Sequence, residues 1–421
     1  MPPSPSWSRP LDRPVADSLI NELAEQYGTP LYIYNANIIG ERIADLRRFD
    51  VIRYAEKANA NLSLLNWIRD QGVTIDTVSV WEIERALKAG YTASEIVFTA
   101  DLFDHHISKF LREYHVHVNL GSPDMLEQYT QLKTGREVTL RINPGFGHGH
   151  DRKVNTGGEE SKHGIWHESL PAVLKRAGKL GLKVTGIHMH IGSGSDFTHL
   201  SRVREAISKA AFMAKEHLTT ISVGGGLPVP YRPDEKPFDV AHYCADWLAT
   251  KKTIEAELGK SINMEVEPGR YLVAECGLLV CEVRGIKSSG AVNYILVDAG
   301  FDNLIRPAMY GAYHHITIPG RASAGIKPQV VAGPLCESAD VFTQTKGGYI
   351  EPRPLPETQA GDLLCIHNAG AYTASMASNY NSRPLAAEVL VENGAARLVR
   401  QRQSLEDMLS NEIDYLQANS R

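Results

Sequence analysis

Between residues 51 and 275 the sequence alternates short runs rich in β-branched residues with segments whose apolar residues recur at helical spacing. The segments LSLLNWIRDQG (62–72) and WEIERALKAG (81–90) show this spacing, and both end in glycine, as helix C-termini often do. Eight strands that alternate with helices predict a parallel (β/α)8 barrel. The eight runs are VIRYAE (51–56), TIDTVS (74–79), IVFTA (96–100), VHVNL (116–120), VTLRIN (138–143), VTGIHMH (184–190), ISVGG (221–225) and INMEVE (262–267).

From residue 276 the pattern changes to strand-like runs that follow one another without long helices between them. The segment EVLVENGAARLVR places Asn393 and Gly394 between two alternating strands, which is a strong hairpin signal. Ser404 is a capping-type residue, so the tail that follows it is predicted to form a terminal helix. This half of the chain therefore reads as a mostly antiparallel β domain.

The length of 421 residues exceeds one core of typical size and predicts two domains. The expected class is α/β plus all-β, a (β/α)8 barrel followed by a mostly antiparallel β domain. We assign residues 1–30 to an N-terminal tail and a segment associated with the β domain, residues 31–275 to the barrel, and residues 276–421 to the β domain. The run LYIY (31–34) precedes the first barrel strand, and the sequence alone does not place it.

Composition excludes several classes of function. The formal net charge is -5 and no long basic run occurs, so we expect no nucleic-acid partner. No apolar run approaches the roughly 20 residues that span a bilayer, and the N-terminus lacks the apolar core of a signal peptide, so no membrane partner is expected. The five cysteines follow no metal-ligand spacing, which is typical of free thiols in a reducing cytoplasm.

Active sites of such barrels form at the C-terminal ends of the strands. Lys57 follows the first run directly and is surrounded in sequence by Ala58, Asn59 and Asn61. For one lysine the ordinary interpretation is a solvated turn residue. Other strand ends also carry polar or glycine-rich groups, however, namely Asp76, Ser79, Asn119, Asn143, the segment HMHIGSGS, the triplet Gly224–Gly226 and the segment EPGR.

Strands seven and eight of these barrels commonly frame a phosphate site. Gly224, Gly225 and Gly226 would let backbone N–H groups approach phosphate oxygens closely, and Ser193 adds a hydroxyl. A glycine triplet by itself is more often a structural turn. Together with Lys57 it predicts pyridoxal 5′-phosphate, with Lys57 as the Schiff-base lysine.

A zinc site is the competing interpretation. His188 and His190 lie at i and i+2 of one strand and so face the same side, with Asp76 and Glu267 as candidate further ligands. The structural alternative is a packed, hydrogen-bonded histidine, which we favour for His188, whereas His190 could stack on a flat cofactor ring. A metal has no use for the glycine triplet, so we predict no metal.

Six motifs resemble the bacterial diaminopimelate decarboxylases, from about residue 28 to the C-terminal region and in matching order. These enzymes remove a carboxylate from the D-centre of meso-2,6-diaminopimelate to give L-lysine. The resemblance implies a pyridoxal-phosphate-binding barrel of the alanine-racemase type, a β domain, and a homodimer in which the Cys336–Glu337 loop reaches the neighbouring barrel. The motifs are YAEKANAN (54–61), HMHIGSG (188–194), GGGLPVPY (224–231), EPGRYL (267–272), GPLCESAD (333–340) and GAYTASMASNYN (370–381).

The resemblance also implies a role for each matching residue. Glu267 resembles the partner of the pyridine nitrogen, a role that requires a carboxylate because it keeps the ring protonated and able to accept electrons. Toward the cofactor, Lys57 resembles the Schiff-base lysine, His190 the residue that stacks on the ring, and Ser193, Gly226, Gly269 and Arg270 the phosphate pocket. Toward the substrate, Arg270, Arg306, Tyr310, Glu337 and Tyr372 resemble ligands, Tyr372 also touches the cofactor, and Cys336 resembles the proton donor.

Three alternatives stay open. Another decarboxylase of this fold would act on ornithine, arginine or a carrier-tethered amino acid and would lack an arginine for the distal carboxylate. A racemase would favour a weaker electron sink than Glu267 provides, and a non-catalytic cofactor-binding barrel would not need GPLCES and GAYTAS. The sequence departs from many family members at FTADLFDHH (98–106), at His163 and at Thr373.

Overall fold

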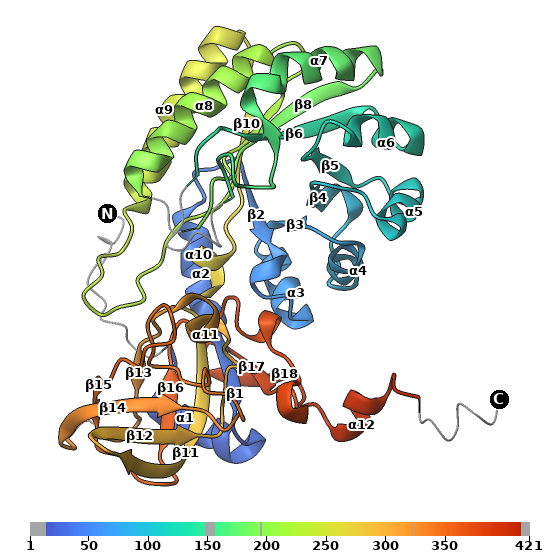
Figure 1. The fold of residues 1–421 in the computed structure, drawn as a ribbon. Helices are drawn as coiled ribbons and strands as arrows, with labels where there is room; N and C mark the ends of the chain where they lie inside the picture. Colours follow the sequence, from blue (N-terminus) through green and yellow to red (C-terminus); the bar gives the residue numbers. More distant parts are fainter. Residues whose placement is uncertain (1–13, 148–155, 194–195, 322, 414–421) are drawn as a thin grey trace. The chain divides into compact units, whose positions relative to one another are not determined.

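The computed structural model describes residues 14–147, 156–193, 196–321 and 323–413. Within these ranges the chain forms two compact units, whose elements are labelled in Figure 1. The barrel unit comprises residues 37–230 and 235–274. The β unit comprises the described residues up to 36, residues 231–234 and the described residues from 275 onward.

Eight parallel strands close the described part of the barrel unit into a ring. They are β2 (Val51–Ala55), β3 (Thr74–Thr77), β4 (Ile96–Ala100), β5 (His117–Leu120), β6 (Glu137–Asn143), β8 (Lys183–His188), β9 (Thr220–Ser222) and β10 (Asn263–Val266). Closure is complete because β10 pairs with β2 and β5 pairs with β6. A two-residue strand, β7 (Ile165–Trp166), pairs with β6 outside the ring. The predicted barrel is confirmed, strand for strand.

Helices lie outside the ring of strands (Figure 1). Short polar residues begin several of them, because their side chains accept hydrogen bonds from otherwise unpaired N–H groups of the first turn. Asn61 does so for α3, Ser79 for α4 and Asp104 for α5. The helices are α2 (Ala36–Asp45), α3 (Leu62–Asp70), α4 (Val80–Lys88), α5 (His105–Glu113), α6 (Met125–Leu132), α7 (Leu170–Lys179), α8 (Phe197–Met213), α9 (Val240–Leu258) and α10 (Arg270–Val273), with single 3-10 turns η1 (Glu56–Ala58), η2 (Ala93–Glu95) and η4 (His167–Ser169).

The β unit is built on a nine-stranded sheet that is mostly antiparallel, as predicted. Its strands are β1 (Leu31–Asn35), β11 (Gly277–Ser289), β12 (Val292–Val297), β13 (Ile316–Thr317), β14 (Ile326–Ala332), β15 (Arg353–Pro356), β16 (Leu363–Ile366), β17 (Ala387–Glu392) and β18 (Ala395–Arg400). Only the pairs β1–β17 and β12–β14 are parallel among its described strands. Its helices are α1 (Asp17–Tyr27), α11 (Arg306–Tyr310) and α12 (Leu405–Leu409), with 3-10 turns η5 (Ala374–Met376) and η6 (Tyr380–Ser382).

The run LYIY belongs to the β unit, so the barrel begins near residue 37 and not at residue 31 as the sequence predicted. This run forms β1, which lies between β11 and β17 and pairs with both. Its burial pattern is that of a central strand, since four of its five residues are buried. Such a strand needs two partners, and both are supplied by residues more than 240 positions later in the chain.

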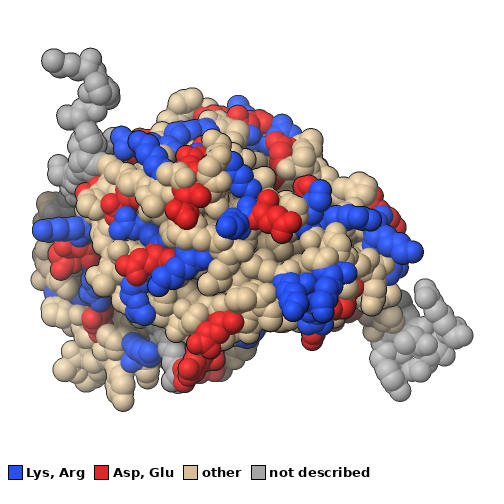
Figure 2. Space-filling model, turned by 90° about the horizontal axis from the view of Figure 1, so that it is seen from above, with Lys and Arg blue, Asp and Glu red and all other residues tan. Residues whose placement is uncertain are grey.

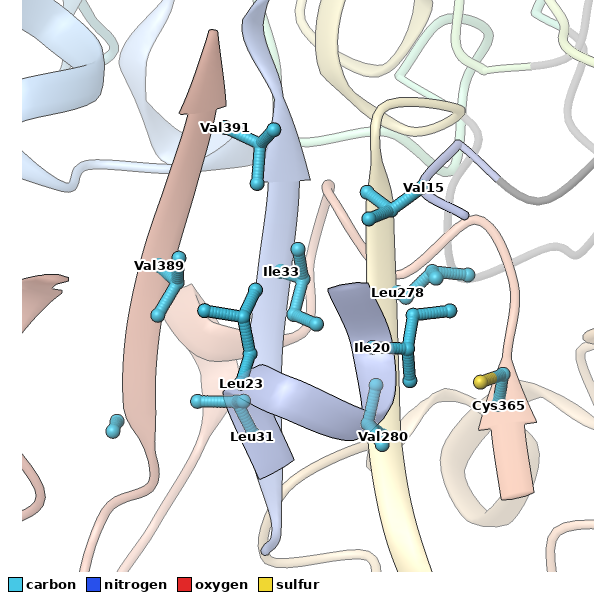
Figure 3. Close-up of a cluster of buried hydrophobic side chains, with 11 residues drawn as sticks. Val15, Ile20, Leu23, Leu31, Ile33, Leu278, Val280, Cys365, Val389 and Val391 are labelled. Carbon is cyan, nitrogen blue, oxygen red and sulfur yellow. The ribbon is translucent and has the colours of Figure 1, made fainter. Parts of the chain in front are cut away.

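Helix α1 covers this sheet and completes its hydrophobic core (Figure 3). Ile20 and Leu23 are one helical turn apart, so both lie on the face of α1 that packs on the strands. Figure 3 shows Leu23 next to Leu31 of β1, and Ile20 next to Leu278 and Val280 of β11. The whole cluster is Val15, Ile20, Leu23, Leu31, Ile33, Leu278, Val280, Cys365, Ala387, Val389 and Val391.

Two local predictions for the C-terminal part are confirmed. Asn393 and Gly394 join β17 to β18 with φ values of 50° and 82°, the positive pair that a two-residue type I′ hairpin turn requires. Ser404 caps α12 by accepting from the Asp407 N–H, while the Asp407 side chain accepts from the Ser404 N–H. The predicted helix ends at Leu409, and the last part of that prediction, from residue 414, lies outside the described residues.

Basic and acidic side chains are interspersed on the face shown in Figure 2. This mixture agrees with the small net charge of the chain. None of the helices in the described residues combines the length and apolarity that a membrane crossing requires.

Candidate active site

Lys57 lies in η1, directly after β2, at the C-terminal end of a barrel strand. Its side chain is exposed, although Glu56 and Ala58 on either side are buried. The neighbouring asparagines shape this turn: Asn59 accepts from the Tyr54 hydroxyl through its carbonyl, and Asn61 caps α3. Burial raises the pKa of Asp76 and Glu82 and the Lys57 charge opposes it, whereas burial and Lys57 both lower the pKa of His190, so the ammonium lies within electrostatic reach of all three.

Glu267 directly follows β10 and lies buried in the barrel with two hydrogen-bond donors on its carboxylate. His188 Nε2 donates to Oε2 over 2.8 Å, and Ser222 Oγ donates to Oε1 over 2.6 Å. Burial acts to raise the pKa of this carboxyl, but His188 and the hydrogen bonds from His188 and Ser222 outweigh burial and hold the pKa below its usual value. Glu267 is therefore an ionised carboxylate inside the barrel.

Asp76 on β3 is a second buried carboxyl, and its titration is displaced in the opposite direction. Burial and the nearby Glu267 charge raise the pKa of Asp76 to about 8, although a 2.5 Å hydrogen bond with Thr99 Oγ1 opposes this. Asn119 Nδ2 donates to the same hydroxyl over 2.8 Å. Two interacting buried carboxyls with divergent pKa values are typical of a functional site.

His190 and the glycine triplet lie next to each other at this end of the barrel. The Gly225 N–H donates to His190 Nδ1 over 3.3 Å, so that nitrogen carries no proton. Burial, together with Lys57 and Arg141, holds the pKa of His190 well below its usual value, and the ring is neutral. A Cβ atom at Gly224 or Gly226 would lie 2.3 or 2.2 Å from a backbone carbonyl, and both have positive φ, so the triplet accepts no side chain there.

The remaining barrel residues of the predicted site also lie at strand ends. Ser193 follows β8 and is half-buried, whereas Arg270 begins α10 and is buried. Gly269 precedes Arg270 and lies close to the β2 end, because a Cβ there would be 3.2 Å from the Cβ atoms of Ala55 and Ala58. The barrel unit thus assembles Lys57, His190, Ser193, Gly226, Glu267, Gly269 and Arg270 at strand ends.

The histidines considered as zinc ligands have other partners. His188 Nε2 is engaged with Glu267, and His190 Nδ1 accepts from a backbone amide. Within the described part of the chain, no three His, Cys, Asp or Glu side chains are grouped so that they could hold a metal ion. The neutral ring, the buried anion and the side-chain-free triplet instead match a flat, phosphorylated cofactor.

The other five predicted residues belong to the β unit, and Arg306 is the most deeply buried of them, with 2% of its surface exposed. Its guanidinium donates to His314 Nε2 over 2.7 Å and lies over the Tyr231 ring at 4.8 Å. Burial excludes the interpretation of Arg306 as a surface ion pair. Tyr310, four residues later in α11, is half-buried.

Cys336 and Glu337 are exposed on the loop after β14. The Cys336 N–H donates to Asn381 Oδ1 over 2.9 Å. Asp340 anchors the same loop, because its carboxylate accepts from the N–H groups of Leu335 and Phe301, each at 2.7 Å. Cys336 is thus a surface thiol on a braced loop, whereas the other four cysteines are buried.

Tyr372 and the three departures from the family pattern also have a definite structural setting. Tyr372 is half-buried and has a φ of 57°. Thr373 has a negative φ and bonds to the Ala369 carbonyl, so a glycine is not required there. His163 Nδ1 lies 2.6 Å from Asp101 Oδ2, and Asp101 comes from the FTADLFDHH segment, so these two departures form one ion pair or hydrogen bond.

Several residues of the site were missed from the sequence. His188 is a packed, hydrogen-bonded histidine, as expected from the sequence, but its partner Glu267 was not predicted. Ser222, Asp340 and Asn381 gave no distinct signal of their own, although the last two lie within the GPLCESAD and GAYTASMASNYN motifs.

Comparison with known proteins is consistent with this geometry. The family model described as pyridoxal-dependent decarboxylase, pyridoxal binding domain, matches residues 41–274. The chain is 50% identical over 407 residues to the diaminopimelate decarboxylase of Escherichia coli (strain K12), over 94% of this chain and 97% of that protein. It is also 50% identical over 400 residues to the Streptomyces coelicolor enzyme of the same name, over 93% and 91% of the two chains.

Solved structures of diaminopimelate decarboxylases are also similar to this chain. A crystal structure of diaminopimelate decarboxylase matches with a TM-score of 0.93 at 48% identity. The match covers 97% of this chain and 100% of that chain. The Helicobacter pylori diaminopimelate decarboxylase complexed with L-lysine matches with a TM-score of 0.83 at 30% identity, covering 96% and 100%. With half of its residues identical over nearly its whole length, and with a barrel that presents a lysine, a buried carboxylate and a glycine cradle at its strand ends, the chain belongs to the diaminopimelate decarboxylase family of pyridoxal-dependent decarboxylases.

Proposed function

We propose that this protein decarboxylates meso-2,6-diaminopimelate at its D-centre, with pyridoxal 5′-phosphate, to give L-lysine and CO2 as the last step of lysine biosynthesis. The observation that carries the choice of substrate is the buried Arg306 guanidinium in a unit that also contains Cys336 and Tyr372. The alternative is a decarboxylase of this fold that acts on another basic or carrier-tethered amino acid.

The barrel residues fit the cofactor. Lys57 would hold it covalently, and the backbone of the triplet at Gly226, with Ser193, Gly269 and Arg270, would hold its phosphate. The neutral His190 ring offers a flat, uncharged face to the pyridine ring. When bound, pyridoxal phosphate supplies an electron sink for the pair released from the breaking Cα–carboxylate bond.

Glu267 favours decarboxylation over racemisation. Its buried carboxylate is held as an anion by His188 and Ser222, so it can stabilise a proton on the ring nitrogen. A protonated ring is the stronger electron acceptor. A racemase would favour a cofactor ring that accepts electrons less strongly.

Substrate selection depends on the distal carboxylate, which lysine and ornithine lack. An arginine fork matches a carboxylate with two parallel hydrogen bonds, and we assign this role to Arg306 with Arg270, Tyr310 and Tyr372 as further ligands. A substrate without the carboxylate cannot form these charge-assisted hydrogen bonds with the guanidinium, a loss on the order of 3 kcal/mol. That cost excludes lysine, the product, from acting as a competing substrate.

Proton delivery to Cα is assigned to Cys336, with Glu337 as the ligand of the substrate amine. Both side chains are exposed on their own chain, and an exposed reactive thiol is vulnerable to oxidation. We therefore propose a two-fold homodimer in which this loop completes the active site on the partner barrel. All five cysteines are free, which suits the proposed cytoplasmic location.

The direct test is a substrate panel with detection of CO2. The purified protein, loaded with pyridoxal phosphate, is given meso-, LL- and DD-diaminopimelate, lysine, ornithine and arginine. We expect CO2 from meso-diaminopimelate with L-lysine as the amine product. A preference for ornithine, arginine or lysine would support the alternative and overturn the proposal.

A further inference from the structure

Two buried side chains, His188 and Ser222, hold the Glu267 carboxylate. His188 is 1% exposed, Ser222 3% and Glu267 7%, so the three groups form a buried polar cluster. They come from three adjacent strand ends, β8, β9 and β10. Each carboxylate oxygen of Glu267 receives one hydrogen bond, from His188 on one side and from Ser222 on the other.

Two features of this cluster distinguish it from ordinary core packing. First, a carboxylate has about four lone-pair sites, so after two donors Glu267 can still accept one more proton donor without losing either bond. Second, the pKa of the nearby Asp76, which is also buried but accepts from Thr99, is raised, whereas the pKa of Glu267, which accepts from His188 and Ser222, is lowered. The difference between the two carboxyls is the donor set, because both are buried in the same barrel.

The titratable groups that interact electrostatically with Glu267 are His188, His190, Arg53 and Asp76. Arg53 is occupied with Glu265, which it contacts through two nitrogens at 3.0 and 3.2 Å. Asp76 opposes ionisation of Glu267, since a negative charge on one raises the pKa of the other. His188 is therefore the direct charge-assisted donor that favours the anion.

We infer that His188 is a positioning residue which, with Ser222, fixes Glu267 as an anion with one free acceptor site directed to the ring nitrogen of the bound cofactor. The inference rests on the proposed function. It gives a function to the packed, hydrogen-bonded histidine that the sequence predicts at position 188. It predicts that the proton on the cofactor ring, and not only the stability of the barrel, depends on His188.

The test is the ¹⁵N NMR shift of ring-labelled pyridoxal phosphate bound to the protein, which reports whether the ring nitrogen carries a proton. It is measured from roughly pH 6 to 9 for wild type, His188→Leu, His188→Gln and Ser222→Ala. In wild type we expect a protonated nitrogen across this range. In His188→Leu the apparent pKa of the ring nitrogen should fall by at least about one unit, a tenfold loss of protonation, because one charge-assisted hydrogen bond is lost.

Gln can donate an N–H from a similar position, so the apparent pKa of the ring nitrogen in His188→Gln should stay close to the wild-type value. In Ser222→Ala this pKa should fall by less than in His188→Leu. If His188→Leu binds the cofactor and keeps the wild-type shift at every pH, the inference is wrong, whatever its activity. If His188→Leu does not fold, Ser222→Ala decides. A wild-type titration of the cofactor ring nitrogen in Ser222→Ala would then contradict the inference.

The NMR titration can fail without the substrate panel failing, and the reverse also holds. A wild-type protein that binds the cofactor with a protonated ring but releases no CO2 from diaminopimelate would refute the function and leave the inference intact. A wild-type ring without a proton would refute the inference while decarboxylation could still be observed.

Discussion

The Arg306 guanidinium donates to Nε2 of His314 over 2.7 Å, and Nδ1 of the same imidazole donates to the His367 carbonyl over 2.8 Å. Because Nε2 accepts and Nδ1 donates, His314 is neutral, with its proton on Nδ1. Tyr231 contacts both partners, with its ring 4.8 Å from the guanidinium and edge-on to the imidazole at 5.2 Å. The orientation of Arg306 is thus set by a chain of contacts that ends on the backbone of the β unit.

Replacing Arg306 by Ala should abolish most activity on meso-diaminopimelate while the protein still binds its cofactor. The expected loss in kcat/KM is at least about a hundredfold, since roughly 3 kcal/mol of charge pairing disappears. His314→Leu should raise KM more than it lowers kcat, because Arg306 stays present but loses its orientation. Arg321, which pairs with Asp362, provides the control: Arg321→Ala should leave kcat/KM unchanged. Wild-type kinetics in Arg306→Ala would refute the assignment.

Lys57 should be the residue that carries the cofactor, since it is the lysine at the β2 end. Borohydride reduction of the loaded protein, followed by digestion and mass spectrometry, should find the label on the peptide that contains Lys57. Lys57→Ala should take up no label. Lys88, exposed near the end of α4, serves as the control, and Lys88→Ala should be labelled as wild type is. A label on any other lysine contradicts the assignment.

Two inactive variants should restore activity when their subunits exchange. Lys57→Ala and Cys336→Ala are each expected to be inactive, because one lacks the cofactor lysine and the other the proton donor. In a heterodimer with shared sites, one site carries both defects and the other carries none. Equal mixing makes about half of the dimers heterodimeric, so about a quarter of wild-type activity should return. No recovery despite exchange proven by mass spectrometry would show that Cys336 serves its own chain.

Asn381 should hold the Cys336 loop in its active geometry, since its side chain accepts from the Cys336 N–H. Asn381 has a φ of 54°, so Asn381→Gly removes the acceptor without straining the backbone. We expect kcat to fall about fivefold, the worth of one ordinary hydrogen bond, with little change in KM. The control is Asn393→Gly, the same substitution at a φ of 50° in the β17–β18 hairpin, which should leave kcat unchanged. Equal kcat values for the two variants would refute the role of Asn381.

Glu56 should destabilise the protein as pH rises. Burial, with Glu82 nearby, raises the pKa of this carboxyl from 4.5 to about 9, and neither of its oxygens has a hydrogen-bond partner among the described residues. The folded protein therefore holds a proton that the unfolded chain releases above about pH 4.5, so the stabilisation present at low pH is lost as pH rises toward 9.

Glu56→Gln removes this titration, and the two proteins can be compared by urea unfolding from about pH 5 to 8. The free energy of unfolding of the variant, relative to wild type, should increase with pH by up to about 1.4 kcal/mol per unit. Parallel pH profiles would show that Glu56 is ionised when folded.

Much of the fold could be predicted because its signals are local. The eight barrel strands were found from β-branched runs separated by helical periodicity, and the hairpin at Asn393–Gly394 from the positive φ that its turn requires. Strand-end chemistry was also predictable, because a closed parallel barrel brings the ends of all its strands to one side. Lys57, His190 and Glu267 are candidates for this reason, and their roles stay predictions.

The sequence by itself determined which residue types follow each strand, and so the chemistry that the barrel can offer. Tertiary structure alone decided which of these groups touch. The register of β8, β9 and β10 turned His188 and Ser222 into partners of Glu267, and pairing with β11 and β17 moved Leu31–Asn35 into the β unit. Periodicity reports which face of an element a residue occupies, but hydrogen-bond partners and charge states depend on groups that are distant in sequence and are fixed only when the strands close.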